Sequence, residues 1–179
     1  MLSCDELKAL VRTVPDFPAA GIQFRDITTL IAHGDGLAST IEHLADLAAP
    51  ARAAAVAGIE ARGFVFGAAL AIRLGIGFVL LRKAGKLPVS TISTAYDLEY
   101  GSASMELDPG IVDQGERIIL MDDLLATGGT ARAGISLLRR AGAVVEHALF
   151  VIDLPELGGG PALQDVGVEA HCVMAFQGH

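Results

Sequence analysis

The stretch from Ile118 to Gly134 reads IILMDDLLATGGTARAG, and it decides the fold. Its first four residues are apolar and predict a buried strand, and two carboxylates, Asp122 and Asp123, stand at the carboxyl end of that strand. A loop of small residues, 126–130, then leads into a helix. In an open parallel sheet, ligands bind in the crevice outside the carboxyl ends of the strands. We therefore predict the ligand site here.

The loop and the acid pair favour different parts of one ligand. Glycines and hydroxyls at a helix N-terminus favour a phosphate, because free N–H groups point outward and the helix dipole attracts an anion. Gly128 and Gly129 also allow the backbone to approach the ligand closely. Asp122 and Asp123 repel phosphate, but they can accept hydrogen bonds from vicinal hydroxyls or meet a cation bound to phosphate. The combination predicts a sugar phosphate.

Two other interpretations fit parts of this stretch. A strand that ends in Asp-Asp could be the magnesium-binding strand of a P-loop NTPase, which requires an upstream Gly-rich loop ending in Gly-Lys-Ser/Thr. The only Gly-Lys pair is Gly85-Lys86, and Leu87 follows it, so this class is excluded. An ordinary strand, turn and helix with solvated acids remains the other interpretation, although the whole arrangement rarely occurs without a ligand.

Composition indicates one globular domain, residues 1–179, in an acidic protein. An apolar content of 52% rules out a disordered chain. The net charge is −8, from 13 basic and 21 acidic residues, and the absence of a basic run argues against nucleic acid as a partner. An anionic substrate must therefore meet a local cluster of cations, and the candidates are Arg62, Arg82, Lys83 and Lys86.

The cysteines and the apolar segments have structural interpretations. Cys4 and Cys172 lie near opposite ends without metal-ligand spacing. His171 beside Cys172 looks like a ligand pair, but nothing in the sequence completes a site, so we interpret both as structural. Residues 63–81 are apolar, but Arg73 and several glycines interrupt them, which favours a helix, a turn and a strand over a membrane span. With an acidic N-terminus and no signal peptide, we expect a cytoplasmic protein without a membrane partner.

Periodicity and punctuation predict alternating strands and helices. Ser3 and Glu6 form a capping box for a first helix, and Asp35 can cap a second. The other expected elements are a loop over 14–24, a strand over 54–59, a helix over 63–74, a strand over 77–81, a flexible hairpin or flap over 84–107, a strand over 117–121, a helix over 130–141, a strand over 143–152, a Gly-Pro loop over 153–162 and a strand over 166–176. This order predicts an α/β fold with a mostly parallel sheet covered on both faces.

Two further segments repeat the strand–loop–helix pattern or add cations. GIEARGF, residues 58–64, places Arg62 before a helix, where its planar guanidinium suits a phosphate. Alone, an arginine there is more often simply solvated, but the neighbouring diol-phosphate motif favours a ligand. The basic cluster of residues 82–86 could be a solvated turn, or it could neutralise pyrophosphate, and we favour the second interpretation.

The stretch 118–134 resembles the phosphoribosyl pyrophosphate (PRPP) signature of type I phosphoribosyltransferases. Four more segments resemble the adenine phosphoribosyltransferase family in order and spacing, from residue 15 to about 150: PDFPAAGIQFRDIT at 15–28, GIEARGF at 58–64, RKAGKLP at 82–88 and LEYG at 98–101. The resemblance implies the type I phosphoribosyltransferase fold, a central, mostly parallel sheet flanked by helices. It also implies an N-terminal base-binding hood over about residues 1–34 and a flexible flap over about 84–107.

The resemblance implies a role for each matching residue. Asp122 and Asp123 hold the ribose hydroxyls. The 5′-phosphate lies in the loop formed by Ala126, Thr127, Gly128, Gly129 and Thr130. Adenine stacks on Phe24, and its edge is read by the backbone of Gln23 and Arg25, with Leu124 also at the base. Pyrophosphate faces Arg62, Lys83 and Lys86, and Glu99 and Tyr100 belong to the closing flap. Two segments depart from the family: Gln23 replaces a small aliphatic residue, and residues 89–92 look unusual.

The implied reaction transfers phosphoribose from PRPP to N9 of adenine and yields AMP and pyrophosphate, as in purine salvage. Mg²⁺ is expected as the cofactor bound with PRPP, and a homodimer as the assembly. Similar 6-oxopurine enzymes carry an acid at the position of Ala126, so we expect Glu99 to exchange the proton at purine N7, with Arg62 as the second catalytic residue. The alternatives are a non-catalytic PRPP-sensing regulatory domain and a phosphoribosyltransferase for xanthine, guanine or orotate. The chain has no room for a helix-turn-helix, which disfavours the sensor, and Ala126 and the Phe24-Arg25 loop argue against other bases.

Overall fold

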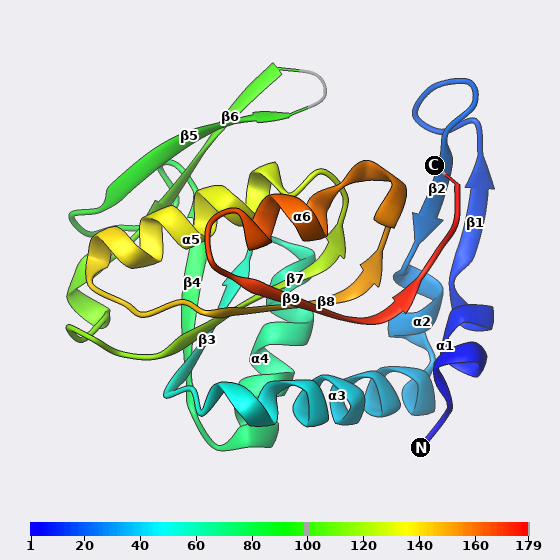
Figure 1. Ribbon diagram of the computed structural model, residues 1–179, viewed down its shortest axis with the longest axis horizontal. Helices are drawn as coiled ribbons and strands as arrows, with labels where there is room; N and C mark the ends of the chain where they lie inside the picture. Colours follow the sequence, from blue (N-terminus) through cyan, green and yellow to red (C-terminus); the bar gives the residue numbers. More distant parts are fainter. Residues whose placement is uncertain (99–100, 179) are drawn as a thin grey trace.

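A seven-stranded sheet forms the centre of the computed structural model, which describes residues 1–98 and 101–178 (Figure 1). Its strand order is β5-β6-β4-β3-β7-β8-β9. Five strands run parallel: β3 (Ala55–Ile59), β4 (Gly77–Lys83), β7 (Ile118–Leu125), β8 (His147–Asp153) and β9 (Glu169–Ala175). The hairpin of β5 (Ile92–Leu98) and β6 (Gly101–Leu107) adds to β4 in the antiparallel sense. The predicted α/β fold with a mostly parallel sheet is confirmed.

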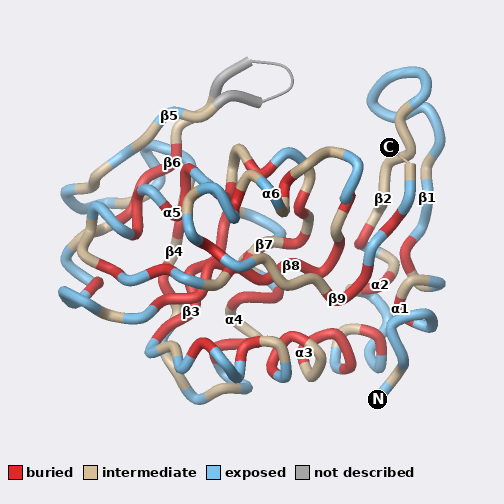
Figure 2. The backbone as a smooth tube through the Cα atoms, viewed as in Figure 1, coloured by how far each residue is buried: buried red, intermediate tan, exposed pale blue. Residues whose placement is uncertain are grey.

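Helices cover both faces of the sheet. On one face lie α3 (Gly34–Ala48) and α4 (Arg62–Leu74), and on the other lie α5 (Gly129–Ala141) and α6 (Gly159–Gln164). Strand β7 contributes to both cores, because Ile119 and Met121 face the first pair of helices and Ile118 and Leu120 face the second. Burial on both faces explains the continuous apolar run that marked this strand in the sequence. Figure 2 shows the buried residues gathered along the sheet and the inner sides of the helices.

The N-terminal segment forms a small unit beside the sheet (Figure 1). Helix α1 (Cys4–Leu10) begins with the predicted capping box of Ser3 and Glu6 and buries Leu7. Strands β1 (Arg12–Pro15) and β2 (Gln23–Asp26) pair in the antiparallel sense, and α2 (Thr28–Ala32) follows them. The loop expected over 14–24 is therefore the tip of a hairpin, and its prolines and glycine mark the turn rather than the whole segment.

Several predicted boundaries were wrong. The cap of α3 is His33, whose Nδ1 accepts a hydrogen bond from the amide of Gly36 at 3.1 Å, and Asp35 lies within the first turn. Strand β7 continues to Leu125 because Asp122, Leu124 and Leu125 still pair with β8. The expected loop over 153–162 contains the start of α6, which follows Gly158 in the left-handed conformation with φ of 78°. Local sequence signals do not report pairing with a distant strand.

Within residues 1–98 and 101–178, no helix combines the length and the apolarity needed to cross a bilayer. The segment 63–81 forms α4, a turn at Gly75 and β4, as predicted.

Candidate active site

The predicted motifs meet at the carboxyl ends of the parallel strands. Arg62 begins α4 directly after β3, Asp122 and Asp123 lie in the last half of β7, and the loop of residues 126–130 joins β7 to α5. Arg62, both acids and the continuous segment 124–131 line one hollow of about 180 Å³. Segments 60 residues apart in the sequence therefore form a single site.

The loop 126–130 presents an uncapped helix N-terminus. Gly128 is the N-cap of α5, it has φ of 83°, and no side chain caps the helix. The amides of the first turn therefore remain free to bind an anion. Helix α6 supports this loop from behind, because a Cβ atom on Gly159 would stand 2.4 Å from the carbonyl oxygen of Ala126. The predicted phosphate cradle is thus shaped by a second element that the sequence analysis did not identify.

The two acids lie at the floor of the hollow. The side chain of Asp123 is only 6% exposed, and its Oδ2 lies 3.0 Å from Nε of Arg62. Asp122 is partly buried, and its Oδ1 accepts a hydrogen bond from the amide of Asp123 at 2.9 Å. Gly63 allows α4 to approach them, since a Cβ atom there would stand 2.8 Å from the carbonyl oxygen of Met121. The acid pair and Arg62 thus form one charged unit.

Burial controls the protonation of this pair. It raises the pKa of Asp122 well above the ordinary aspartate value, and the adjacent charge of Asp123 raises it further. Burial also raises the pKa of Asp123, although Arg62 opposes the shift. Two neighbouring carboxylates therefore share one cation, and a ligand that brings hydroxyl donors or a second cation would stabilise their charged forms.

Two buried or partly buried glutamates shape the basic segment 82–86. Glu106 on β6 accepts hydrogen bonds from the amides of Gly85, Lys86 and Leu87 at 2.9, 2.7 and 2.7 Å. Chiefly the amides of Gly85 and Leu87 lower the pKa of Glu106. These three hydrogen bonds hold the turn that carries Lys86. The side chains of Lys83 and Lys86 are both exposed. The sequence contained no signal for this role of Glu106.

Glu60 in turn holds the other end of the segment. Its Oε2 accepts bonds from Nε of Arg82 at 3.0 Å and from the amide of Lys83 at 3.1 Å. Burial raises the pKa of Glu60, but these hydrogen bonds outweigh it and lower the pKa overall. Arg82, a candidate anion-binding cation in the sequence, is therefore paired with Glu60, which leaves Lys83 and Lys86 as the exposed cations of this loop.

The predicted base-binding residues lie on β2 of the N-terminal hairpin. The ring of Phe24 packs edge-to-face on Phe17, with 5.2 Å between the ring centroids. The guanidinium of Arg25 donates to Oγ1 of Thr13 and to the carbonyl oxygen of Gln177, and it lies over the ring of Phe176. The side chain of Arg25 is thus engaged with the C-terminal segment, which runs beside β2 in Figure 1. The remaining base candidates, Gln23 and Leu124, are partly buried, and Leu124 lines the hollow.

The expected flap forms the β5–β6 hairpin, which packs against α5 (Figure 1). Its predicted site residues, Glu99 and Tyr100, lie outside the described residues. Tyr96 on β5 is described, and it lines a hollow of about 690 Å³ with Gly129 and Arg132. Burial and then the charges of Asp122 and Glu60 raise the pKa of Tyr96, so its phenol lies within electrostatic reach of the acids. The sequence analysis did not single out Tyr96.

Comparisons with known proteins agree with this geometry. The family described as phosphoribosyl transferase domain matches residues 23–159. A protein of Erythrobacter litoralis called adenine phosphoribosyltransferase is 61% identical over 178 residues, which are 99% of this chain and 100% of the relative. The chain belongs to the adenine phosphoribosyltransferase family. The type I phosphoribosyltransferase fold and the enzyme class inferred from the sequence, pentosyl transfer, are thereby confirmed.

Solved structures extend the likeness to three dimensions. An adenine phosphoribosyltransferase from Thermoanaerobacter pseudethanolicus has a TM-score of 0.92 and 41% identity, and the match covers 97% of this chain and 100% of that one. The enzyme from Giardia lamblia, complexed with 9-deazaadenine, also has a TM-score of 0.92 at 32% identity, with 98% and 99% coverage. The likeness to the adenine phosphoribosyltransferase family therefore extends beyond the segments between residue 15 and about 150 that matched in the sequence, and it includes the C-terminal region.

Proposed function

We propose that the protein transfers the 5-phosphoribosyl group of PRPP to N9 of adenine and releases AMP and pyrophosphate. One observation carries this proposal: an uncapped helix N-terminus, an acid pair with one buried and one partly buried member, and Arg62 line the same hollow. Those three groups match the phosphate, the diol and the pyrophosphate of PRPP. The choice of adenine as the base is supported by relatives that carry this name and by the Giardia enzyme complexed with 9-deazaadenine.

The phosphate and the ribose would be oriented by rigid elements. The amides at the start of α5 would bind the 5′-phosphate, and the hydroxyl of Thr130 or Thr127 can donate a further hydrogen bond. Asp122 and Asp123 would accept hydrogen bonds from the ribose hydroxyls. Holding both ends of the sugar keeps C1 in line with the incoming base, and orientation of this kind lowers the activation free energy of a reaction between two bound groups.

Charge develops at two places during the transfer. The bond from C1 to the pyrophosphate oxygen breaks as the bond from N9 to C1 forms, so the ribose becomes oxocarbenium-like and the pyrophosphate gains negative charge. The guanidinium of Arg62, which pairs with Asp123, would also interact with the negative charge of the pyrophosphate. Lys83 and Lys86 would add positive charge there. Preorganised charges of this kind commonly contribute several kcal/mol to transition-state stabilisation.

Magnesium fits the donor set of this hollow, because carboxylate oxygens are the ligands that this hard cation prefers. Asp122 and Asp123 would hold it together with the oxygens of PRPP. When bound, Mg²⁺ supplies positive charge to the departing pyrophosphate without a proton transfer.

The base site is proposed on the N-terminal hairpin. Phe24 would stack on adenine, and the backbone of Gln23 and Arg25 would read its edge, with Leu124 at the floor. The engaged side chain of Arg25 supports the use of its backbone rather than its guanidinium. Because Ala126 has no proton to exchange, Glu99 is the proposed acid–base at N7, with Tyr100 beside it in the closing flap. A closed flap would also exclude water that could hydrolyse PRPP.

The proposed assembly is a homodimer. Its support is the outer face of α4, where Val65 and Ile72, seven residues apart, are 40% and 83% exposed. Full burial of a large apolar side chain from complete exposure gains about 1.5–3 kcal/mol, so covering Ile72 would gain most of this free energy and covering Val65 less. The cytoplasmic location expected from the sequence stays a prediction.

Pyrophosphate release from PRPP and Mg²⁺ tests the proposal, measured with adenine, hypoxanthine, guanine, xanthine or orotate and without a base. Of the five bases, we expect only adenine to cause pyrophosphate release. This release should be lost or sharply reduced in Asp123→Ala and Glu99→Ala. Glu116→Ala serves as the matched control, because this partly buried glutamate lies away from the hollow. Tight PRPP binding without release for any base would support the sensor instead. Full activity of Glu99→Ala would exclude proton transfer by Glu99 and leave the proposed function unaffected.

A further inference from the structure

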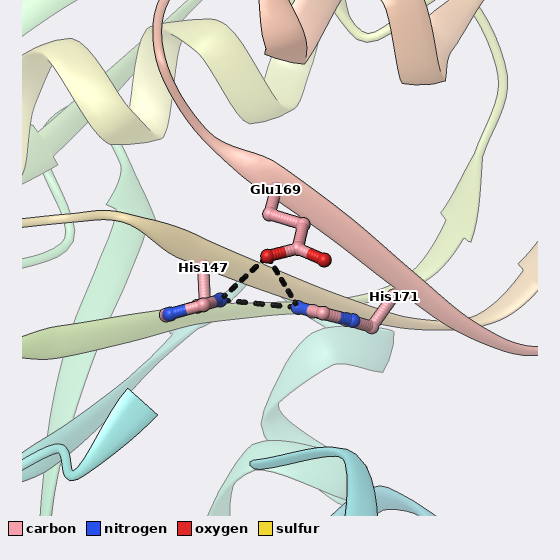
Figure 3. Close-up of side chains that lie close together, drawn as sticks. All are labelled: His147, Glu169 and His171. Carbon is pink, nitrogen blue, oxygen red and sulfur yellow. Dashed lines mark hydrogen bonds and ion pairs between the residues drawn. The ribbon is translucent and has the colours of Figure 1, made fainter. Parts of the chain in front are cut away.

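Three potential metal ligands meet at the beginning of two neighbouring strands, away from the proposed active site. His147 begins β8, and Glu169 and His171 are the first and third residues of β9. Glu169 pairs in register with His147, and His171 pairs with Leu149. Because side chains alternate along a strand, all three point to the sheet face on which Leu149 and Val173 pack against α3. Figure 3 shows the two imidazoles and the carboxylate converging on one point.

The distances among the three ligand atoms match a metal site. Nδ1 of His147 lies 3.1 Å from Nε2 of His171, and Oε2 of Glu169 lies 3.8 and 3.9 Å from these nitrogens. A triangle with these sides has a centre about 2.1 Å from each atom, within the ~2.0–2.2 Å of zinc–nitrogen and zinc–oxygen bonds. This centre lies in the plane of the three atoms, so an ion that also takes a fourth ligand lies above the plane, and the exposed carboxylate of Glu169 must move closer to the two imidazoles.

The two histidines of the site are largely buried, whereas the glutamate is exposed to solvent. The side chains of His147 and His171 are only 18% and 16% exposed, and their rings stack with 5.3 Å between centroids. The Glu169 side chain is 68% exposed and leaves room for solvent at a fourth position.

We propose that His147, His171 and Glu169 bind one divalent transition-metal ion, with Zn²⁺ the best match and a water molecule as the fourth ligand. Two imidazoles and one carboxylate suit Zn²⁺ better than Mg²⁺ or Ca²⁺, which prefer oxygen ligands. Cys172 is not a ligand, because side chains alternate along β9 and Cys172 faces the opposite side of the sheet from His171, into the core beneath α5 and α6. The sequence analysis interpreted His171 and Cys172 as structural, because it found nothing to complete a site; the residues that complete it come from two strands.

A bound ion would link β9, the strand at the edge of the sheet, to its neighbour β8. It lies at the amino ends of these strands, whereas the phosphate loop and the acid pair lie at the carboxyl ends of the sheet. We therefore expect occupation to stabilise the folded protein and to leave pyrophosphate release with adenine unchanged. An ion that binds only the folded state raises the melting temperature with its concentration.

Zinc titration of metal-free protein without a polyhistidine tag tests the proposal, with Mg²⁺ in excess to occupy the acid pair. We expect one Zn²⁺ per chain in competition with a chromogenic chelator, a rise in melting temperature, and visible d–d absorption when Co²⁺ replaces Zn²⁺. Glu169→Gln is the first variant, because its exposed side chain can change without unfolding the protein. It should weaken binding at least tenfold, and His171→Asn should abolish the Co²⁺ spectrum.

Glu146→Gln is the matched control, since this neighbouring carboxylate pairs with Arg117 outside the triad. It should bind Zn²⁺ as the wild-type protein does. Zinc binding that is equal in wild type, Glu169→Gln and His171→Asn would overturn the proposal and place the ion elsewhere. The absence of binding and of any thermal shift would also overturn it, and would leave a hydrogen-bonded histidine pair only.

Discussion

Gly159 supports the phosphate loop because it has no side chain. In Gly159→Ala, the new Cβ would stand 2.4 Å from the carbonyl oxygen of Ala126 and 2.7 Å from Cδ1 of Leu125. The loop must shift, so we expect a higher KM for PRPP and a loss of about 1–3 kcal/mol in unfolding free energy. Kinetics and urea denaturation measure both effects.

Gly160→Ala is the matched control for this experiment. A Cβ atom at Gly160 meets nothing within 4 Å, and the residue lies in the same helix. Alanine favours a helix over glycine, so stability should stay constant or rise by up to about 1 kcal/mol. Equal effects of the two substitutions would show that the close approach to Ala126 has no consequence.

Asp122 combines a proposed substrate contact with a buried charge. Its raised pKa means that the folded protein holds a proton that the unfolded chain has already released, so this residue lowers stability as the pH rises above the ordinary value of about 3.9. Asp122→Asn removes this loss and keeps an oxygen that can accept the hydrogen bond from the Asp123 amide. We expect the variant to gain stability over the wild type at pH 8 and little or none at pH 4.

Melting temperatures at the two pH values measure the gain, at about 2–4 °C for each kcal/mol in a chain of this size. Activity should fall about 10–100-fold, because a hydrogen bond to a charged group contributes about 1.5–3 kcal/mol. A variant that is less stable than the wild type at pH 8 would contradict the inferred cost of the buried charge.

At the scale of elements, the turn after β4 depends on a carboxylate from β6. Glu106→Gln replaces one acceptor oxygen by an amide group that cannot accept bonds from Gly85, Lys86 and Leu87. We expect the turn to loosen and the KM for PRPP to rise several-fold, with a smaller effect on the KM for adenine. Steady-state kinetics with each substrate varied in turn measures the difference.

Glu116→Gln is a suitable control, since Glu116 accepts a backbone bond from Asp113 in a loop away from the hollow. The pH dependence adds a second test. The lowered pKa of Glu106 means that its stabilising contribution is complete above the ordinary glutamate value of about 4.3 and is lost as the pH falls through the lowered pKa. Acid unfolding of Glu106→Gln should therefore depend less steeply on pH than that of the wild type.

At the scale of the whole molecule, the outer face of α4 is the proposed dimer contact. Ile72→Glu places a charge on the most exposed of the large apolar side chains on this face, so we expect a dimer to dissociate to the monomer. Light scattering after size-exclusion chromatography measures the mass. Ile111→Glu, at a 51% exposed isoleucine elsewhere, should leave the mass unchanged. A wild-type monomer, or a dimer that persists in Ile72→Glu, would exclude this contact.

The sequence by itself determined the alternation of strands and helices, the phosphate loop and the acid pair. These features are local: an apolar run, a Gly-Thr loop and adjacent carboxylates occur within 17 consecutive residues, and their chemistry depends on residue type and strand polarity. The family segments near residues 15–28, 58–64 and 82–88 located the other parts of the candidate site for the same reason.

Only the tertiary structure decided which distant residues meet. Separate elements are joined by the hydrogen bonds that Glu106 accepts from the turn after β4, by the support of the phosphate loop by Gly159, and by the pairing of Arg62 with Asp123. The cluster of His147, Glu169 and His171 is the clearest case. In the sequence, Glu169 and His171 stand near Cys172, and we interpreted His171 and the cysteine as structural. Strand register brings His147, 24 residues before His171, to the same place, because side chains that share a face are selected by pairing rather than by proximity in the chain.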